Sequence, residues 1–269
     1  MNGSAAVKIP SIKVLGTRID AVQIPQIIER MEGWIKDNQR HNYIVVANLN
    51  TIVTGKRNAF LQEAVNNSSL AIPDGFPLLV MGRLAGHALK KRAYGPDLMS
   101  SFLKIAEARQ YSHFFYGSTE KTLTKLIRNL KIQFPKIKIA GSFAPPFRPL
   151  TQEEDKKIAE LINNSSPAVL WVGVGCPKQE IWMYNHREKL NIPVMIGVGA
   201  AFDFLAGTKP QAPAWLGDNG WEWLFRLATE PTRLWRRYII DGSLFIWYLG
   251  VESVGSLLKK IRNKSNQAK

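Results

Sequence analysis

The feature that most constrains the fold of this chain is a regular alternation of short apolar runs with longer segments of helical periodicity over the first 200 residues. Apolar runs such as Val169–Val174 are typical of strands buried on both faces of a sheet. Strands that alternate with helices predict a mostly parallel sheet with helices on both faces. We therefore predict an α/β, Rossmann-like fold with strands at Tyr43–Ala47, Leu70–Ile72, His113–Tyr116, Ile137–Gly141, Val169–Val174 and Val194–Val198, and helices at Pro25–Asp37, Thr51–Asn66, Pro96–Arg109, Glu120–Phe134, Gln152–Asn163 and Pro177–Leu190.

The chain changes character after about Gly207. Residues 213–264 have no strand pattern, and they hold five of the eight tryptophans. We divide the chain into an α/β catalytic core, residues 1–207, and a helical C-terminal appendage, residues 208–269. Three helices are predicted in the appendage, with breaks at Pro231 and at Asp241-Gly242. Two interpretations of it stay open: a helical cap on the sheet, or a membrane-facing segment that also reaches the active site.

The charge of the chain predicts an anionic partner. Its 36 lysines and arginines exceed its 21 aspartates and glutamates, a net charge of +15. Such an excess suits a nucleic acid, an anionic membrane surface or a phosphorylated substrate.

Residues 1–10 lack the apolar segment of a signal peptide, and no stretch reaches the ~18 apolar residues of a spanning helix. With a single cysteine, Cys176, the chain suits a reducing compartment, so we expect a cytoplasmic protein whose membrane contact is peripheral.

Polar and small residues follow five of the predicted strands. In open parallel sheets ligands bind beyond the carboxyl ends of the strands, so these residues converge on one rim and form the candidate site: Asn48, Asp74-Gly75, Gly117-Ser-Thr119, Gly173–Gln179 and Gly199–Asp203.

Asp74 directly follows an apolar strand and precedes a glycine. Two interpretations stay open for its carboxylate. It is the N-cap of the following helix, a common role for such a residue, or it is a general base held on a rigid element and facing the crevice.

The turn Gly173-Val-Gly-Cys-Pro-Lys-Gln-Glu180 leads into a predicted helix. Backbone N–H groups at such a helix start favour a phosphate, and Lys178 adds charge, although it could also only anchor the loop. The dinucleotide-binding motif GxGxxG requires a third glycine. Lys178 occupies that position in the turn after Gly173, and Phe202 occupies it in Gly197-Val-Gly-Ala-Ala-Phe202. A nicotinamide-dependent enzyme is therefore disfavoured.

Metal ligation has little support in the sequence. The four histidines show no paired spacing, and no Asp-x-Asp motif occurs. We therefore predict no metal site and assign the neutralisation of a diphosphate to arginines, lysines and helix ends.

Several motifs in order carry a family resemblance. The chain resembles the WecG/TagA/CpsF glycosyltransferases, which also include a xanthan-assembly glucosyltransferase and N-acetylmannosamine transferases. The resemblance runs from about Val14 to Tyr238 and rests on Asn48-Leu-Asn-Thr51, Ile72-Pro-Asp-Gly75, Arg92-Ala-Tyr-Gly-Pro-Asp97, Gly173 to Glu180, Gly197-Val-Gly-Ala-Ala-Phe-Asp203, and Gly220-Trp-Glu-Trp-Leu-Phe-Arg226 followed by Arg233-Leu-Trp-Arg-Arg-Tyr238.

The resemblance implies a metal-independent, inverting transferase that moves a hexose from a UDP-sugar to a polyprenyl-diphosphate-linked saccharide at the cytoplasmic membrane face, in bacterial exopolysaccharide or cell-wall polymer synthesis. It implies Asp74 as the base, with Arg92 and Gln179 as further catalytic residues. One departure is Val46, where some relatives carry threonine, and the run from Asp74 to Pro77 is closer to exopolysaccharide than to teichoic-acid members. The donor-binding residues then predicted are Asn48, Gly75, Gly95, Asp97, Gly117, Gly173, Gly175, Lys178, Asp203, Arg226, Arg233 and Arg237.

Apolar residues of the appendage precede a basic cluster, a pattern that suits an anionic bilayer. The alternative for this segment is an ordinary helix packed on the core.

Two other functions stay open for the chain. One is a basic nucleic-acid-binding protein, although the sequence lacks a motif that reads nucleic acid, and the other is another nucleotide-dependent enzyme such as a dehydrogenase. The predicted partners are the UDP-sugar, the lipid-linked acceptor and the membrane, not a nucleic acid, and a homo-oligomer is left open. The residues behind the membrane prediction are Leu244, Phe245, Trp247, Tyr248 and Leu249, then Lys259, Lys260, Arg262 and Lys264.

Overall fold

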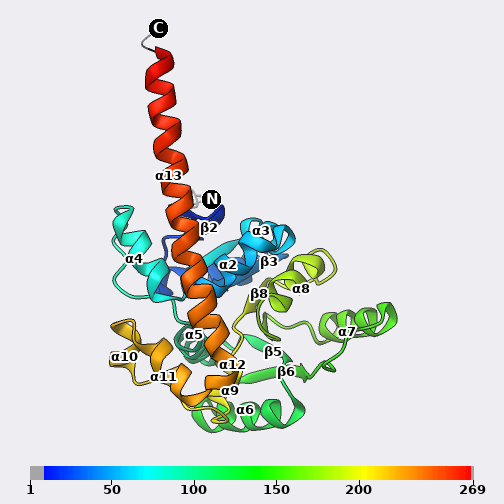
Figure 1. The fold of residues 1–269 in the computed structure, drawn as a ribbon. Helices are drawn as coiled ribbons and strands as arrows, with labels where there is room; N and C mark the ends of the chain where they lie inside the picture. Colours follow the sequence, from blue (N-terminus) through cyan, green and yellow to red (C-terminus); the bar gives the residue numbers. More distant parts are fainter. Residues whose placement is uncertain (1–8, 268–269) are drawn as a thin grey trace.

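A six-stranded parallel sheet forms the centre of the protein (Figure 1), here a computed structural model that describes residues 9–267, without the side chains of 214, 218 and 255–267. The strand order is β4-β3-β8-β7-β5-β6, with every neighbouring pair parallel. The predicted α/β class is confirmed. The strands are β3 (Asn42–Ala47), β4 (Leu70–Pro73), β5 (Ser112–Gly117), β6 (Lys138–Phe143), β7 (Val169–Gly173) and β8 (Val194–Gly197).

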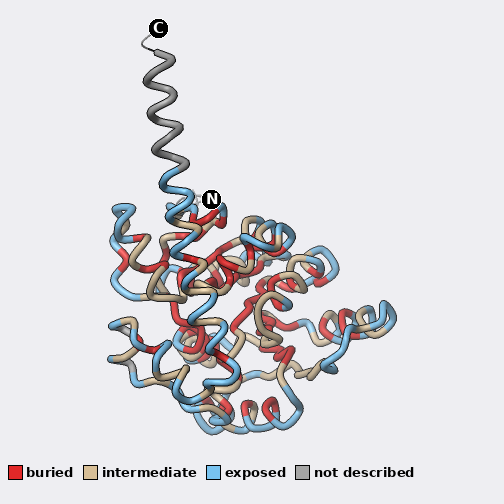
Figure 2. Tube along the Cα trace, viewed as in Figure 1, coloured by how far each residue is buried: buried red, intermediate tan, exposed pale blue. Residues whose placement is uncertain are grey.

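Both faces of the sheet are buried because successive side chains of a strand point to opposite sides. Ile44 and Val46 join one apolar cluster, and Tyr43, Val45 and Ala47 join the other. The first cluster includes residues of α1 (Ile24–Lys36), α5 (Gly95–Arg109), α6 (Glu120–Gln133) and α9 (Ala201–Leu205). The second includes residues of α2 (Leu49–Arg57), α3 (Ala59–Asn66), α7 (Gln152–Ser165) and α8 (Lys178–His186). Figure 2 shows the buried residues concentrated in these central layers.

Local signals set most helix boundaries. Thr151 and Glu154 form a capping box at the start of α7, in which the Thr151 hydroxyl accepts from the Glu154 N–H at 3.2 Å. The single helix predicted at Thr51–Asn66 is wrong. Asn58 leaves the helical conformation at φ −127° and ψ 95°, so that α2 ends there and the Asn58 side chain caps α3.

The predicted elements did not include a hairpin before α1, and they implied a helix after β4 only through the N-cap interpretation of Asp74. The strands β1 (Ser11–Val14) and β2 (Thr17–Asp20) form a hairpin whose turn residues, Leu15 and Gly16, both have positive φ. Leucine is rare in that conformation, so the turn has no sequence signal. The helix α4 (Phe76–Leu84) follows β4 directly, with Pro77 in its first turn.

The C-terminal appendage is helical, as predicted. Its elements are α10 (Ala214–Asp218), α11 (Glu222–Thr229), α12 (Pro231–Trp235), a π-helical turn η1 (Arg236–Ile240) and α13 (Asp241–Gln267). The break at Pro231 is confirmed, but the break at Asp241-Gly242 is wrong. Asp241 keeps helical angles, φ −68° and ψ −30°, and pairs with Arg57 of α2 at 3.6 Å, so the helix continues through the glycine (Figure 1).

The start of α13 packs on the core along one side, as the cap interpretation of the tail predicts, and the membrane-facing interpretation stays a prediction. Phe245 is buried in the second core cluster, where Leu244, Tyr248 and Leu249 pack against it. Trp247, on the other side of the helix, is 66% exposed. The side chains of the basic cluster, Lys259, Lys260, Arg262 and Lys264, lie outside the described residues. Within residues 9–267 no helix is both long and apolar enough to cross a bilayer.

Candidate active site

Two neighbouring cavities lie beyond the carboxyl ends of the strands, where the appendage meets the core. One is polar and has a volume of about 430 Å³, and the other is more apolar and has a volume of about 280 Å³. Both are lined by residues of the core and of the appendage. Four residues line both cavities and so mark their junction: Asn48, Asp74, Arg226 and Arg237.

Asp74 lies at this junction and is not the N-cap of the helix that follows it. Gly75 is the N-cap of α4, and the Asp74 carboxylate instead accepts from the Gly95 N–H at the start of α5, at 3.1 Å. Burial raises the pKa of Asp74 to about 6, with Glu222 adding to the rise while Arg92 opposes it. A carboxylate that titrates near neutrality and faces two cavities can exchange a proton with a bound group.

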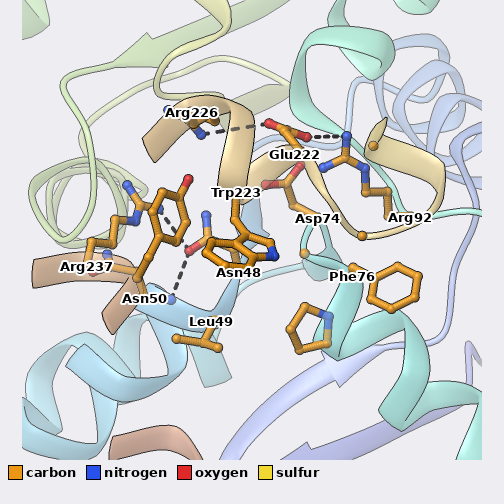
Figure 3. Close-up of a pocket in the computed structure, with 15 residues that line it drawn as sticks. Asn48, Leu49, Asn50, Asp74, Phe76, Arg92, Glu222, Trp223, Arg226 and Arg237 are labelled. Atoms are coloured by element: carbon orange, nitrogen blue, oxygen red, sulfur yellow. Dashed lines mark hydrogen bonds and ion pairs between the residues drawn. The ribbon is translucent and has the colours of Figure 1, made fainter. Parts of the chain in front are cut away.

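A row of alternating charges crosses the site above Asp74 (Figure 3). The carboxylate of Glu222 contacts the Arg92 guanidinium, and its other oxygen lies 3.9 Å from Arg226. Arg92 also lies over the ring of Tyr94, 4.0 Å from its centroid. The glutamate and Arg226 come from α11, whereas Arg92 and Asp74 belong to the core. The site is therefore built jointly by the core and the appendage.

Arg237 approaches the junction from the other side. Its guanidinium donates to Asn48 Oδ1 at 3.1 Å, and the same oxygen accepts from the N–H groups of Asn50 and Thr51 as the cap of α2. Val46 of β3 lines the polar cavity. The capped start of α2, which follows β3, and Arg237 of η1 therefore meet at the junction of the two cavities.

The glycine-bearing turn after β7 forms one wall of the polar cavity. Gly173 and Gly175 line it, and Gly175 has φ +83°, a conformation that suits glycine. The amide of Gln179 accepts from the Gly175 N–H at 3.2 Å and donates to Glu180 at 2.9 Å. Glu180 is fully buried, and burial raises its pKa. Gln179 therefore braces the turn in addition to lining the cavity.

One ion pair joins the core and the appendage at the polar cavity, and two more lie within the appendage. Lys209 lies 3.4 Å from Asp203 and 3.0 Å from Glu230, and Arg233 pairs with the same glutamate at 2.6 Å. Asp203, Lys209 and Arg233 all line the cavity. A diphosphate bound here would meet Lys209 and Arg233 already held in place by Glu230.

The predicted residues divide between the two cavities and their surroundings. Asp74, Arg92, Gln179, Asn48, Gly75, Gly95, Gly173, Gly175, Asp203, Arg226, Arg233 and Arg237 line one or both cavities. Asp97, Gly117 and Lys178 line neither. Asp97 and Lys178 are exposed in the first turns of α5 and α8, and Gly117 packs against Gly173.

Other lining residues were not predicted. Glu222, Trp223 and Tyr238 of the appendage line the apolar cavity, with Phe76 at the start of α4. Phe147, 86% exposed, lies at the polar cavity. Glu222 and Trp223 lie within a motif of the family resemblance, but nothing in the sequence pattern indicates which helix faces the cavity. Among the described residues, no three histidine, cysteine, aspartate or glutamate side chains gather where they could hold a metal, and metal independence stays a prediction.

A carboxylate and several cations that meet beyond the strand ends of a parallel sheet define a class, the α/β enzymes that act on phosphorylated substrates. Within that class, the chain belongs to the WecG/TagA/CpsF family of glycosyl transferases, whose family model matches residues 12–258. The predicted resemblance is confirmed and extends past Tyr238 into α13. Family membership favours a transferase over the two alternatives, a nucleic-acid-binding protein and a dehydrogenase.

Curated relatives carry one shared name, N-acetylglucosaminyldiphosphoundecaprenol N-acetyl-beta-D-mannosaminyltransferase. The relative from Bacillus spizizenii is 28% identical over 217 residues, 81% of this chain and 82% of the relative. The relative from Bacillus subtilis strain 168 is 28% identical over 177 residues, 66% of this chain and 67% of the relative. The relative from Staphylococcus aureus strain NCTC 8325 is 26% identical over 226 residues, 84% of this chain and 87% of the relative. These names give no support to the exopolysaccharide prediction.

Proposed function

We propose that this glycosyltransferase moves a sugar from a UDP-sugar to a polyprenyl-diphosphate-linked saccharide, with inversion at the anomeric carbon and with Asp74 as the general base. The observation that carries the proposal is the position of Asp74, which lines a polar and an apolar cavity at once. A base between two cavities can touch an acceptor in one of them while a donor occupies the other.

The polar cavity suits the donor. Arg226, Arg233 and Arg237 line it, and arginines bind phosphate oxygens well. The glycine-bearing turn at Gly173–Gly175 lets the backbone approach a diphosphate closely. The exposed ring of Phe147 is available to stack on a nucleobase.

The apolar cavity suits the acceptor. Leu49, Phe76, Pro77, Trp223 and Tyr238 line it, and aromatic side chains are common partners of sugar rings and lipid chains. The names of the relatives support an acceptor built on diphosphoundecaprenol-linked N-acetylglucosamine and a donor that carries N-acetylmannosamine. We propose the same acceptor class for this chain, at the cytoplasmic face of the membrane.

The reaction is a single in-line displacement. The acceptor hydroxyl attacks the anomeric carbon from the face opposite the diphosphate, and the bond from that carbon to the phosphate oxygen breaks. The Asp74 carboxylate takes the hydroxyl proton, and UDP leaves with the bonding electron pair. The arginines in the polar cavity stabilise the charge that develops on the diphosphate.

The test is Asp74→Asn, measured with a panel of UDP-glucose, UDP-N-acetylglucosamine, UDP-N-acetylmannosamine and UDP-uronic acids. Removal of a general base typically costs ~10²–10⁴-fold in rate, so transfer with the preferred donor should fall by that factor. UDP affinity, read by calorimetry, should change little because the arginines of the polar cavity are untouched. Unchanged turnover of the asparagine variant would remove Asp74 from the role of base.

A further inference from the structure

Glu222 is a buried acid that the proposed function does not use. It is the first residue of α11 and is 8% exposed. Its carboxylate lies against the Arg92 guanidinium and near Arg226, on the side of Arg92 that faces the appendage (Figure 3). An acid buried at this depth is costly unless its charge is matched, and the two arginines match it.

The position of Arg92 depends on the appendage. Gly217 of α10 lies against the guanidinium so closely that a Cβ at that position would come within 2.5 Å of Arg92 Nη2. On the core side the guanidinium stacks over the Tyr94 ring at 4.0 Å. The carboxylate of Glu222 supplies a negative charge that contacts the same guanidinium. Arg92 is thus confined between a core ring, an appendage backbone and an appendage carboxylate.

The carboxylates of Glu222 and Asp74 therefore both interact electrostatically with the Arg92 guanidinium. The charged groups that face Asp74 are Arg92, Arg226 and Glu222, and the Gly95 N–H donates to it. The phenol of Tyr94 stays neutral, because burial raises its pKa. If Glu222 were absent, the two arginines would act on Asp74 without an opposing charge and would stabilise its carboxylate against accepting a proton.

We propose that Glu222 is a positioning residue for the base. With α11 packed on the core, the Glu222 carboxylate pairs with the Arg92 guanidinium, so that Arg92 does not hold the Asp74 carboxylate and Asp74 can accept the acceptor's proton. This inference rests on the proposed role of Asp74.

The experiment compares Glu222→Gln, which keeps the side-chain shape and removes its charge, with Glu230→Gln. Glu230 is a matched control because it is also an appendage glutamate paired with an arginine, Arg233, but it does not face Asp74. For each full-length protein, the pH dependence of transfer is measured, together with the ¹³C titration of the Asp74 carboxyl, assigned with Asp74→Asn.

In the unaltered protein the rate should fall with acid below about pH 6, where the pKa of Asp74 lies, because a protonated carboxyl cannot accept a proton. Loss of a like charge lowers the pKa of a carboxyl. In Glu222→Gln the acidic limb and the ¹³C midpoint should both move down by on the order of one pH unit, and the rate at neutral pH should fall about tenfold because the base is weaker and Arg92 is less constrained. In Glu230→Gln the limb should not move.

A midpoint that stays in place or moves up in Glu222→Gln would overturn the proposal. If that variant does not fold, Glu222→Asp, which keeps the charge at a shorter reach, should lose rate with its limb in place, and a full rate or a lowered limb would count against the proposal. Failure of this inference can be told apart from failure of the proposed function. An active Asp74→Asn variant would refute only the role of Asp74 as base, and the ¹³C titration would still report whether Glu222 controls the ionisation of Asp74.

Discussion

At the scale of single residues, Arg237 differs from the other arginines around the cavities. Arg92 and Arg226 share Glu222, and Arg233 is paired with Glu230. Among the side chains that the structure describes, the hydrogen-bond partner of the Arg237 guanidinium is the neutral amide oxygen of Asn48, and no carboxylate lies within ion-pair distance of it. A guanidinium held by a neutral partner, at the junction of the two cavities, is well placed to bind a diphosphate.

Arg237→Ala should weaken UDP binding at least about tenfold, because a hydrogen bond to a charged group contributes about 1.5–3 kcal/mol. The matched control is Arg236→Ala, since Arg236 is the adjacent arginine and lies over the exposed Trp235 without lining either cavity. Calorimetric titration with UDP measures both variants. Equal affinities of the two variants would show that Arg237 is not the main diphosphate ligand.

The residues of the candidate site were predictable where position along the chain determines them. Asp74 follows an apolar strand, and every such strand end lies at the rim of the sheet. Side-chain direction in the first helical turn was not predictable, and Asp97 and Lys178, both predicted to bind the donor, line neither cavity. Glu222 was missed because its partner Arg92 lies 130 positions earlier, and only the docking of α11 brings the two together.

At the scale of elements, the sheet and its helices were predictable because continuous apolar strands and amphipathic helices leave a strong periodic pattern. The hairpin β1–β2 was not, since Leu15 adopts a positive φ that no turn rule assigns to leucine. The glycine at the end of β5 is a different case. Gly117 was predicted to bind the donor, and in the structure it permits close pairing of two strand ends.

Gly117→Ala should destabilise the fold by at least about 2 kcal/mol. Its φ is +133°, and a Cβ would lie 2.5 Å from the Gly173 carbonyl carbon, a combination of backbone strain and overlap that costs about 1–3 kcal/mol for the strain alone. Gly33→Ala is the control, because the helical Gly33 has nothing within 4 Å of a Cβ and should gain about 0.5 kcal/mol. Urea unfolding midpoints measure both, and a Gly117 variant as stable as the unaltered protein would contradict the packing described for β5 and β7.

At the scale of the whole molecule, a net charge of +15 is combined with apolar side chains left in solvent on the appendage. The first turns of α13 pack Phe245 into the core while Ile246 and Trp247 are 72% and 66% exposed. Apolar side chains beside positive charge are the pattern of a protein that lies on an anionic bilayer. A protein on such a surface would meet a lipid-linked acceptor in the same bilayer.

The double variant Ile246→Ser with Trp247→Ser should therefore bind anionic vesicles at least about tenfold more weakly, since burial of each side chain in the interface contributes about 1.5–3 kcal/mol. Ile132→Ser is the control, because Ile132 on α6 is 69% exposed and lies on a core helix. Flotation with vesicles that contain phosphatidylglycerol measures binding, and neutral vesicles should retain little of any variant because the electrostatic attraction is lost. Equal flotation of all three proteins would assign membrane contact to another surface, and the apolar cavity would then need a different route for the acceptor.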